Sequence, residues 1–274
     1  MRHHELSVGI VTLTLTLAWG AKGFAAEPKL PLDLNDVSID SPFVKDGRLD
    51  VEAAVKYFED LYRSTSSIAE VRMRVTKPRA QRTMEMKIWT LGQEKVLILL
   101  QSPAREKGTA TLKVGTHLWN YLPKIKRTIR IPPSMMLASW MGSDFTNDDL
   151  VREASFSEDY TYTLVGRAQE PQGWLIRFEA KPELVGLWNR IDLILSNDGT
   201  QPLKADHYDR RNRLARTIVW TDIRKFGEKL IPATMTLVPK DKRGYRTEMT
   251  YTAIDFDVEV PEHFFSLSHL ESLR

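Results

Sequence analysis

The sequence predicts a mainly β protein, built as a strongly curved antiparallel sheet or incomplete barrel with helices against its concave side. Three observations support this fold class: an amphipathic helical pattern early in the chain, a long series of segments in which apolar and polar residues alternate, and one apolar segment that interrupts the series. A sheet of this kind either fills its interior with side chains or encloses a ligand cavity.

The first 25 residues have the pattern of a secretory signal peptide. A short basic start is followed by an apolar run from Val8 to Ala21 and by the small-x-small string GFA, which suits cleavage after Ala25 or, alternatively, after Ala26. The apolar run is too short to cross about 30 Å of hydrocarbon as a helix. We therefore expect an exported chain.

Composition and charge restrict the function classes. The chain of 274 residues has 39 Lys and Arg against 36 Asp and Glu, a net charge of +3, which gives no general reason to expect nucleic acid as a partner. It has no cysteine, so a disulfide framework is excluded and the core must supply the stability. After the signal peptide at 1–25, we expect an extended lead-in at 26–49 and one domain at 50–274.

Residues 49–64 predict an amphipathic helix of about four turns. Asp50 is placed to act as its N-cap. Five apolar side chains recur at helical spacing and form one face that must be buried: Val51, Val55, Phe58, Leu61 and Tyr62.

From residue 69 onward the period of the pattern changes to two. In the first such segment Ala69, Val71, Met73 and Val75 share one face, whereas the opposite face carries Glu and Arg. The alternation continues through residue 131 and resumes from 160 to 256, with a hairpin turn signal at 197–199. In total we expect roughly ten or eleven antiparallel strands.

The series is interrupted at Pro132 and Pro133, because proline stops a strand and suits the first turn of a helix. The string SMMLASWMGS at 134–143 predicts one short apolar helix with Gly142 as its C-cap. Residues 146–152 predict a second capped turn or short helix. The C-terminal string predicts a short turn or helix that docks on the sheet.

An ordered set of motifs resembles one protein family. The set contains WNYLP at 119–123, a basic segment at 124–130, MGSDF at 141–145 and an acidic pair before Leu150; the ending VPEHFFSLSHL also takes part. In this order the motifs resemble a branch of the LolA-like family of outer-membrane lipoprotein-sorting proteins, over nearly the whole predicted domain. Asn147 departs from the pattern, because an aromatic residue is expected there in this branch.

The resemblance implies a periplasmic carrier fold: an unclosed antiparallel β-barrel with helices forming a lid over an apolar cavity that shields acyl chains. It implies lipoprotein acyl chains or phospholipid as cargo, transient membrane contact, a monomer, and an inner-membrane transporter and an outer-membrane acceptor as partners. An envelope sensor or scaffold subunit that works with an inner-membrane transporter is the alternative, because the same fold serves such proteins.

Apolar residues of the interrupting segment and of nearby strands are our candidates for the lid or the cavity lining. Methionine is unbranched and polarizable, so it adapts to ligands of varying shape. Ordinary packing of a helix against a sheet is the alternative explanation. The candidates are Met84, Met86, Ile88, Trp119, Tyr121, Met135, Met136, Trp140, Met141 and Phe145.

Basic residues form a second group of candidates. They are either a solvated face or a contact for anionic lipid head groups or an acidic partner surface. Arg72 and Arg74 have the same two explanations, or they seal the mouth of the cavity by hydrogen-bonding lid carbonyls. The basic candidates are Lys124, Lys126, Arg127 and Arg130.

The sequence contains no recognisable catalytic or metal-binding motif. The spacing of Asp144, Asp148 and Asp149 is not that of a calcium loop, and helix capping explains these residues better. His207 follows Asp206 on a predicted strand, so their side chains face opposite ways. Because a nucleophile elbow, a phosphate loop and a dinucleotide fingerprint are all lacking, we expect neither catalysis nor a metal or cofactor.

Overall fold

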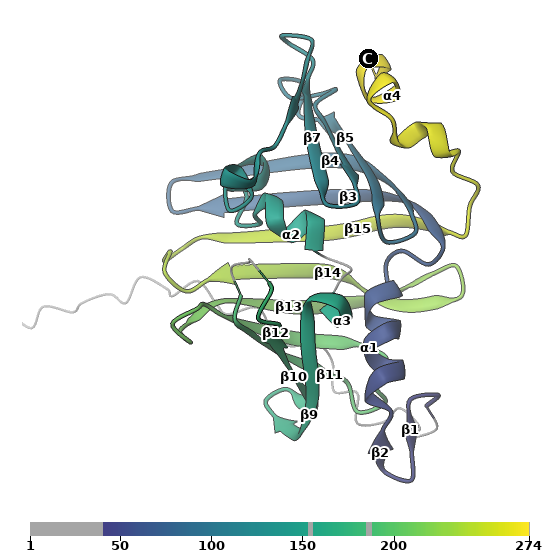
Figure 1. Cartoon of the computed structure of the whole chain (residues 1–274), viewed down its shortest axis with the longest axis vertical. Helices are drawn as coiled ribbons and strands as arrows, with labels where there is room; N and C mark the ends of the chain where they lie inside the picture. The colour runs from purple at the N-terminus through teal and green to yellow at the C-terminus, as the bar shows by residue number, and fades with distance from the viewer. Residues whose placement is uncertain (1–40, 153–155, 185–187, 274) are drawn as a thin grey trace, which may run out of the picture.

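The computed structural model describes residues 41–152, 156–184 and 188–273 (Figure 1). The predicted signal peptide and most of the predicted lead-in lie outside these residues. Residues 41–49 form a small hairpin of two strands, β1 (Val44–Lys45) and β2 (Arg48–Leu49). Within the described part of the chain, no helix is long and apolar enough to cross a membrane.

One antiparallel sheet of 13 strands makes up most of the molecule, so the mainly β prediction is confirmed and the predicted number of strands is too low. The strands are β3 (Ser66–Lys77), β4 (Ala80–Leu91), β5 (Lys95–Ser102), β6 (Ala110–Val114), β7 (His117–Leu122), β8 (Arg127–Arg130), β9 (Tyr160–Gln169), β10 (Gln172–Ala180), β11 (Arg190–Leu195), β12 (Pro202–Tyr208), β13 (Leu214–Phe226), β14 (Lys229–Pro239) and β15 (Arg246–Phe256).

The strand order is a meander that starts in the middle of the sheet. From β3 the strands follow outward to β8 at one edge; β9 forms the opposite edge, and the strands return from there to β15, which pairs with β3. The chain must therefore cross the width of the sheet between β8 and β9. These two edge strands, both fully described, do not pair with each other, so the sheet is not closed.

The sheet is strongly curved. In Figure 1 the central strands β3, β15 and β14 run across the view, whereas β7 and β9 run nearly at right angles to them. Alternation sets the two faces of each strand as predicted: Ala69, Val71, Met73 and Val75 of β3 are all buried. The intervening Arg72 is exposed.

Helix α1 (Val51–Asp60) packs its apolar side against the sheet. Its N-cap is confirmed, because Oδ1 of Asp50 accepts a hydrogen bond from the backbone N–H of Ala53 at 3.1 Å. The ring of Phe58 meets Trp220 of β13 edge-on, with centroids 6.0 Å apart. The helix is shorter than predicted, because the chain after Asp60 enters a tight turn in which Ser64 has a φ of 54°.

The segment that joins β8 to β9 is called here the crossover segment (131–159, of which 153–155 are not described). It carries the 3₁₀ helices η2 (Pro133–Met135) and η3 (Trp140–Gly142) and the short α-helices α2 (Asn147–Arg152) and α3 (Phe156–Asp159). In Figure 1, α1, α2 and α3 all lie in front of the sheet, on the same face. The crossover segment thus spans the sheet on the side that α1 also covers.

The prediction of a single helix at 134–143 is wrong. Met141 has a φ of 50° and Gly142 a φ of 68°, values that an α-helix does not allow, and Gly142 therefore ends a 3₁₀ turn instead of capping a longer helix. The segment folds back on itself, because the N–H of Trp140 donates to the carbonyl of Phe145 at 2.8 Å. A short apolar run does not distinguish a helix from such a loop. The helix predicted at 146–152 is confirmed by α2.

The C-terminal segment docks on the sheet as predicted. It contains η4 (Glu262–Phe265) and α4 (Leu267–Ser272), and the Oγ of Ser266 caps α4 by accepting from the N–H of His269. Phe265 and Leu270 are buried in a hydrophobic cluster with Leu112 and Tyr121 of β6 and β7. This cluster is separate from the core that surrounds the cavity described next.

Candidate ligand cavity

A cavity of about 170 Å³ lies between the sheet, α1 and the crossover segment. It sits where the two large hydrophobic clusters of the core meet, since Tyr62 and Met249 pack against both. Most of its lining is apolar. Examples are Ile88, Ile98 and Ile218 from the sheet, Phe58 from α1, and Trp140 and Phe145 from the crossover segment.

Alternate residues of β11, β12 and β13 form the sheet side of the cavity. Ile191, His207 and Arg216 stand in one row across these strands, because Ile191 pairs with His207 and His207 with Arg216. On β13 the same face continues with Ile218 and Trp220. Strand register thus places one buried histidine and one buried arginine in an otherwise apolar wall.

The first turn of α2 forms the opposite side. The backbone N–H and the Oγ1 of Thr146 both donate to Oδ2 of Asp149, at 2.8 and 2.9 Å. The N–H of Asp149 donates back to Oγ1 of Thr146 at 3.2 Å. This reciprocal arrangement is a capping box, so the predicted capping role of Asp149 is confirmed.

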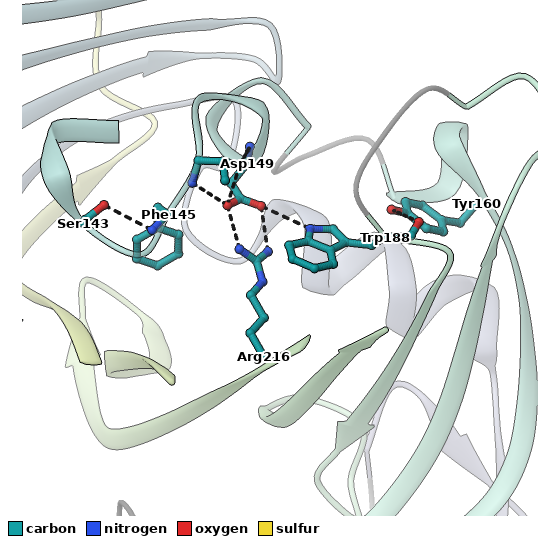
Figure 2. Close-up of polar contacts among 7 residues, drawn as sticks. Ser143, Phe145, Asp149, Tyr160, Trp188 and Arg216 are labelled. Carbon is teal, nitrogen blue, oxygen red and sulfur yellow. Dashed lines mark hydrogen bonds and ion pairs between the residues drawn. The ribbon is translucent and has the colours of Figure 1, made fainter. Parts of the chain in front are cut away.

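The same carboxylate reaches across to Arg216 of β13 (Figure 2). Nη1 of Arg216 donates to Oδ2 of Asp149 and Nη2 donates to Oδ1, each at 2.7 Å. The indole Nε1 of Trp188 donates to Oδ1 at 3.4 Å, and the guanidinium of Arg216 lies 4.2 Å from the centre of the Trp188 ring. Both side chains of the ion pair are buried, Arg216 being 7% and Asp149 14% exposed.

Burial and charge shift the pKa values of this cluster. Burial alone would raise the pKa of Asp149, but the charge and hydrogen bonds of Arg216, together with the Thr146 N–H, lower it from 3.8 to about 2. Burial, and then the charge of Arg216, hold the pKa of His207 well below its usual 6.5. At neutral pH the cluster therefore contains one ion pair and one neutral imidazole.

A buried carboxyl group also joins α1 to α3. Glu59 accepts hydrogen bonds from the backbone N–H of Ser157 at 2.7 Å and from its Oγ at 3.0 Å. Burial raises the pKa of Glu59 and outweighs these hydrogen bonds, which act in the opposite direction. These hydrogen bonds attach α3, the last helix of the crossover segment, to α1.

Two further contacts attach the crossover segment to the sheet. Oγ1 of Thr247 on β15 donates to Oδ2 of Asp144 at 2.8 Å and accepts from the N–H of Asp144 at 3.0 Å. The guanidinium of Arg82 on β4 donates to the carbonyl oxygen of Met141 and forms an ion pair with Glu106 at 3.0 Å. Together with the Asp149–Arg216 pair and the hydrogen bond from Nε1 of Trp140 to Oγ1 of Thr111 on β6, these contacts attach the segment to the sheet.

The sealing contact expected of Arg72 or Arg74 is made by Arg82 instead. Arg72 lies 3.6 Å from Glu85, and Arg74 lies 3.6 Å from Glu248. The alternation of β3 turns both arginines away from the buried face. On β4 the alternation places Arg82 on the face that carries the buried methionines, next to the crossover segment.

Three of the ten apolar candidates line the cavity: Ile88, Trp140 and Phe145. Met84 and Met86 are fully buried in the adjoining core cluster, and Met141 packs against that cluster. The structure thus brings these six residues together on one side of the molecule.

The remaining apolar candidates lie elsewhere. Trp119 and Tyr121 belong to the cluster beneath the C-terminal segment. Met135 is 50% exposed. Met136 lines a separate surface hollow of about 1020 Å³, together with His117 and Arg130.

The four basic candidates are exposed on the hairpin between β7 and β8, which projects from one end of the sheet in Figure 1. Two apolar residues of the same hairpin are also exposed, Ile125 by 56% and Ile129 by 43%. We call this part the basic hairpin tip; it comprises Lys124, Ile125, Lys126, Arg127, Ile129 and Arg130.

Sequence reasoning missed Arg216 and Trp188. For Arg216 a signal is present, because within the predicted alternating series from 160 to 256 it shares one strand face with Ile218 and Trp220. A single arginine on an apolar face needs a buried partner. For Trp188 we find no comparable local signal, since it lies before β11 and acts through contacts far away in the sequence.

Residues 92–272 match the model of a protein family described as "Uncharacterized protein". The chain belongs to this family. Its fold is LolA-like, because solved structures with this fold superpose on most of the chain. No curated protein sequence matches it.

Three solved structures illustrate the likeness. A DUF1329 family protein from Desulfovibrio piger is 23% identical, with a TM-score of 0.70, 80% of this chain covered and 98% of the other. A protein described as an outer membrane lipoprotein-sorting protein domain from Vibrio parahaemolyticus is 21% identical, with a TM-score of 0.68 and coverages of 80% and 99%. A LolA superfamily protein from Nitrosomonas europaea is 19% identical, with a TM-score of 0.68 and coverages of 80% and 98%. Because these identities are below 25%, the comparison establishes only that the chain shares the LolA-like fold of these structures.

Proposed function

We propose that the chain is a periplasmic, non-enzymatic carrier, which binds acyl chains of lipoproteins or lipids in the cavity and transfers them between membranes or partners. The observation that carries this proposal is the cavity itself: an apolar space at the centre of a LolA-like sheet, covered by the crossover segment, which side-chain contacts attach to the sheet. A signal peptide at 1–25 and a carrier domain at 50–274 are part of the proposal.

The size of the cavity supports a crossover segment that moves when a ligand enters. Its volume of about 170 Å³ is close to that of an engineered cavity of about 150 Å³ that binds benzene. A long acyl chain is several times larger, so its entry requires displacement of Trp140 and Phe145 with the crossover segment. Each buried CH₂ group contributes about 0.8 kcal/mol, which offsets the contacts that the segment gives up.

The attachment of the crossover segment to the sheet supports release of the ligand as well as its binding. The crossover segment contributes Trp140 and Phe145 to the cavity lining, and its Asp149 forms the ion pair with Arg216. The closed cover therefore competes with the ligand, which lowers the net affinity and permits transfer to an acceptor. An inner-membrane transporter as donor and an outer-membrane protein as acceptor fit this scheme, with the carrier acting as a monomer.

The basic hairpin tip supports a transient membrane contact. It combines four basic side chains with exposed Ile125 and Ile129. Basic residues near an anionic bilayer surface gain about 1 kcal/mol each, and exposed apolar residues enter the interface. The tip would hold the carrier at the membrane while the cavity is filled or emptied.

Native mass spectrometry tests the proposal. Chain 26–274 is produced by export to the periplasm of a host with two membranes, purified without detergent and weighed with any bound molecule, which is then extracted into organic solvent. We expect an added mass that extracts as phospholipid, fatty acyl compound or acylated peptide. A clean mass that is unchanged after incubation with lipid vesicles and a lipoprotein would contradict the carrier and favour the sensor or scaffold.

A matched pair of variants ties bound mass to the cavity. Ala205→Phe places a ring in the cavity, because Ala205 is buried in its lining. Ala253→Phe makes the same change at an exposed position of β15. We expect the added mass to disappear in the first variant and to remain in the second.

A further inference from the structure

Six buried nitrogen atoms of the described residues have no hydrogen-bond partner. Those of Arg190, Arg246 and His269 lie outside the cavity lining; the other three are Nε1 of Trp220, Nε of Arg216 and Nδ1 of His207. All three residues line the cavity, and they are 5%, 5% and 3% exposed. Indole Nε1 and guanidinium Nε carry hydrogen and only donate, so each requires an acceptor.

Trp220 differs from the other buried or partly buried tryptophans of this region. Nε1 of Trp140 donates to Thr111 at 3.2 Å, that of Trp174 donates to the carbonyl of Asn197 at 2.9 Å, and that of Trp188 donates to Asp149 at 3.4 Å. Buried indole N–H groups normally find such partners. The unpaired N–H of Trp220 therefore marks a place where an acceptor from outside the protein would be bound.

The two donors of β13 lie on one face of the strand. Arg216 and Trp220 are four residues apart, which corresponds to about 13 Å along a strand. Arg216 lies beneath α2, where Asp149 occupies its terminal nitrogens. Trp220 lies beneath α1, where its ring meets Phe58. An acyl chain along β13 would pass both donors.

The charges of the lining decide which acceptor fits. The lining contains the acids Glu59, Asp148 and Asp149 and the bases Arg63 and Arg216, so the described residues include no surplus cation. A buried carboxylate without a counter-ion is strongly disfavoured. A neutral carbonyl oxygen, in contrast, satisfies the N–H group without adding charge.

We propose that the cavity selects neutral acyl esters or amides over free fatty acids and over plain hydrocarbons, and that the indole N–H of Trp220 donates to the acyl carbonyl oxygen. This inference rests on the proposed function, because it assumes that the cavity takes acyl chains. It assigns Trp220 as the residue that recognises the linkage, while the apolar lining binds the chain.

Displacement of the fluorescent probe N-phenyl-1-naphthylamine tests the inference at neutral pH. The competitors are methyl dodecanoate, pentadecane, which has the same number of non-hydrogen atoms, and sodium dodecanoate. In the wild type we expect the ester to compete better than the carboxylate. Trp220→Phe should weaken the ester about fivefold more than it weakens pentadecane, as expected for one lost hydrogen bond.

Phe58→Leu is the matched control, because it removes aromatic volume next to Trp220 but no donor. It should weaken ester and alkane equally. Equal weakening of both by Trp220→Phe, or a carboxylate that outcompetes the ester in the wild type, would overturn the inference and leave the carrier function standing. Failure of the probe and all competitors to bind would overturn both. The wild-type ranking needs no variant, so it still tests the preference for esters over carboxylates if Trp220→Phe does not fold.

Discussion

Asp149 and Arg216 are 67 residues apart in the sequence, yet two parallel hydrogen bonds of 2.7 Å join their side chains in the lining of the cavity. One residue belongs to the crossover segment and the other to the sheet. The closed position of the segment therefore depends on a buried ion pair, and both of its members have further roles: Asp149 caps α2, and Arg216 lies over Trp188.

Replacing Asp149 by Asn tests how much the ion pair stabilises the fold. The substitution keeps an acceptor for Thr146 but leaves the charge of Arg216 buried without a counter-ion. We expect the free energy of unfolding, measured by urea denaturation, to fall by about 3–5 kcal/mol. Asp241→Asn, at an exposed position, is the control and should have almost no effect.

The double variant Asp149→Asn, Arg216→Met separates two effects: the cost of leaving the charge of Arg216 buried without a counter-ion, and the loss of the ion pair itself. Removing both charges leaves no uncompensated ion, so it should regain part of the stability lost in the single variant. If the single variant is no less stable than Asp241→Asn, the pair does not hold the segment in place.

The pKa of Asp149 makes the stability depend on pH in a defined direction. The pKa is about 2 in the folded state against 3.8 as its ordinary value, so the folded state holds the proton less tightly. The stabilisation is fully present above about pH 4 and is lost as the pH falls toward 2. The shift corresponds to about 2 kcal/mol. Urea denaturation between about pH 5 and pH 2 should show wild type and Asp149→Asn converging; a constant difference would argue against this assignment.

His207 should stay neutral where an exposed histidine takes up a proton. Its pKa in the folded state lies well below 6.5, so its contribution to stability is present above about pH 6.5 and declines as the pH falls and the unfolded chain binds the extra proton. We expect its ring signals in NMR spectra to be constant between about pH 8 and pH 6. A ring that titrates in that range in the wild type would show that the site is open to water.

The basic hairpin tip should carry most of the affinity for anionic vesicles. Reversing two charges with Lys124→Glu and Lys126→Glu should weaken binding in a sedimentation assay by at least tenfold, at about 1 kcal/mol for each basic residue removed. Raising the salt concentration should have the same effect on the wild type. Lys107→Glu and Lys240→Glu, at exposed positions outside the tip, form the control; equal weakening by both pairs would show that only net charge matters.

The alternation of apolar and polar residues predicts most of the sheet, because each strand has one buried face. The N-cap of α1 follows from Asp50 for a similar local reason. The path of the crossover segment does not follow from local pattern. Trp140 and Phe145 are buried, whereas Met135, which is equally apolar and belongs to the same segment, is exposed. The order of the strands decides which of these residues are buried, because the segment must cross the sheet from the edge at β8 to the edge at β9.

The polar part of the cavity was less predictable than its apolar part. Ile88, Trp140 and Phe145 are large and apolar, so pattern alone makes them candidates for a buried surface. The contact between Asp149 and Arg216 depends on strand register and on tertiary packing, which one sequence does not reveal. Only the position of Arg216 on an apolar face indicates that a buried partner exists.

The pairing of β15 with β3 also governs how the molecule folds. Each half of the sheet is a chain of local hairpins, whereas the junction joins Met73 to Met249 from opposite ends of the domain. Closing so long a loop is entropically costly, and distant pairings of this kind slow folding. The cavity draws its lining from both halves. We therefore expect the cavity to acquire its shape only when the two halves of the sheet pair with each other.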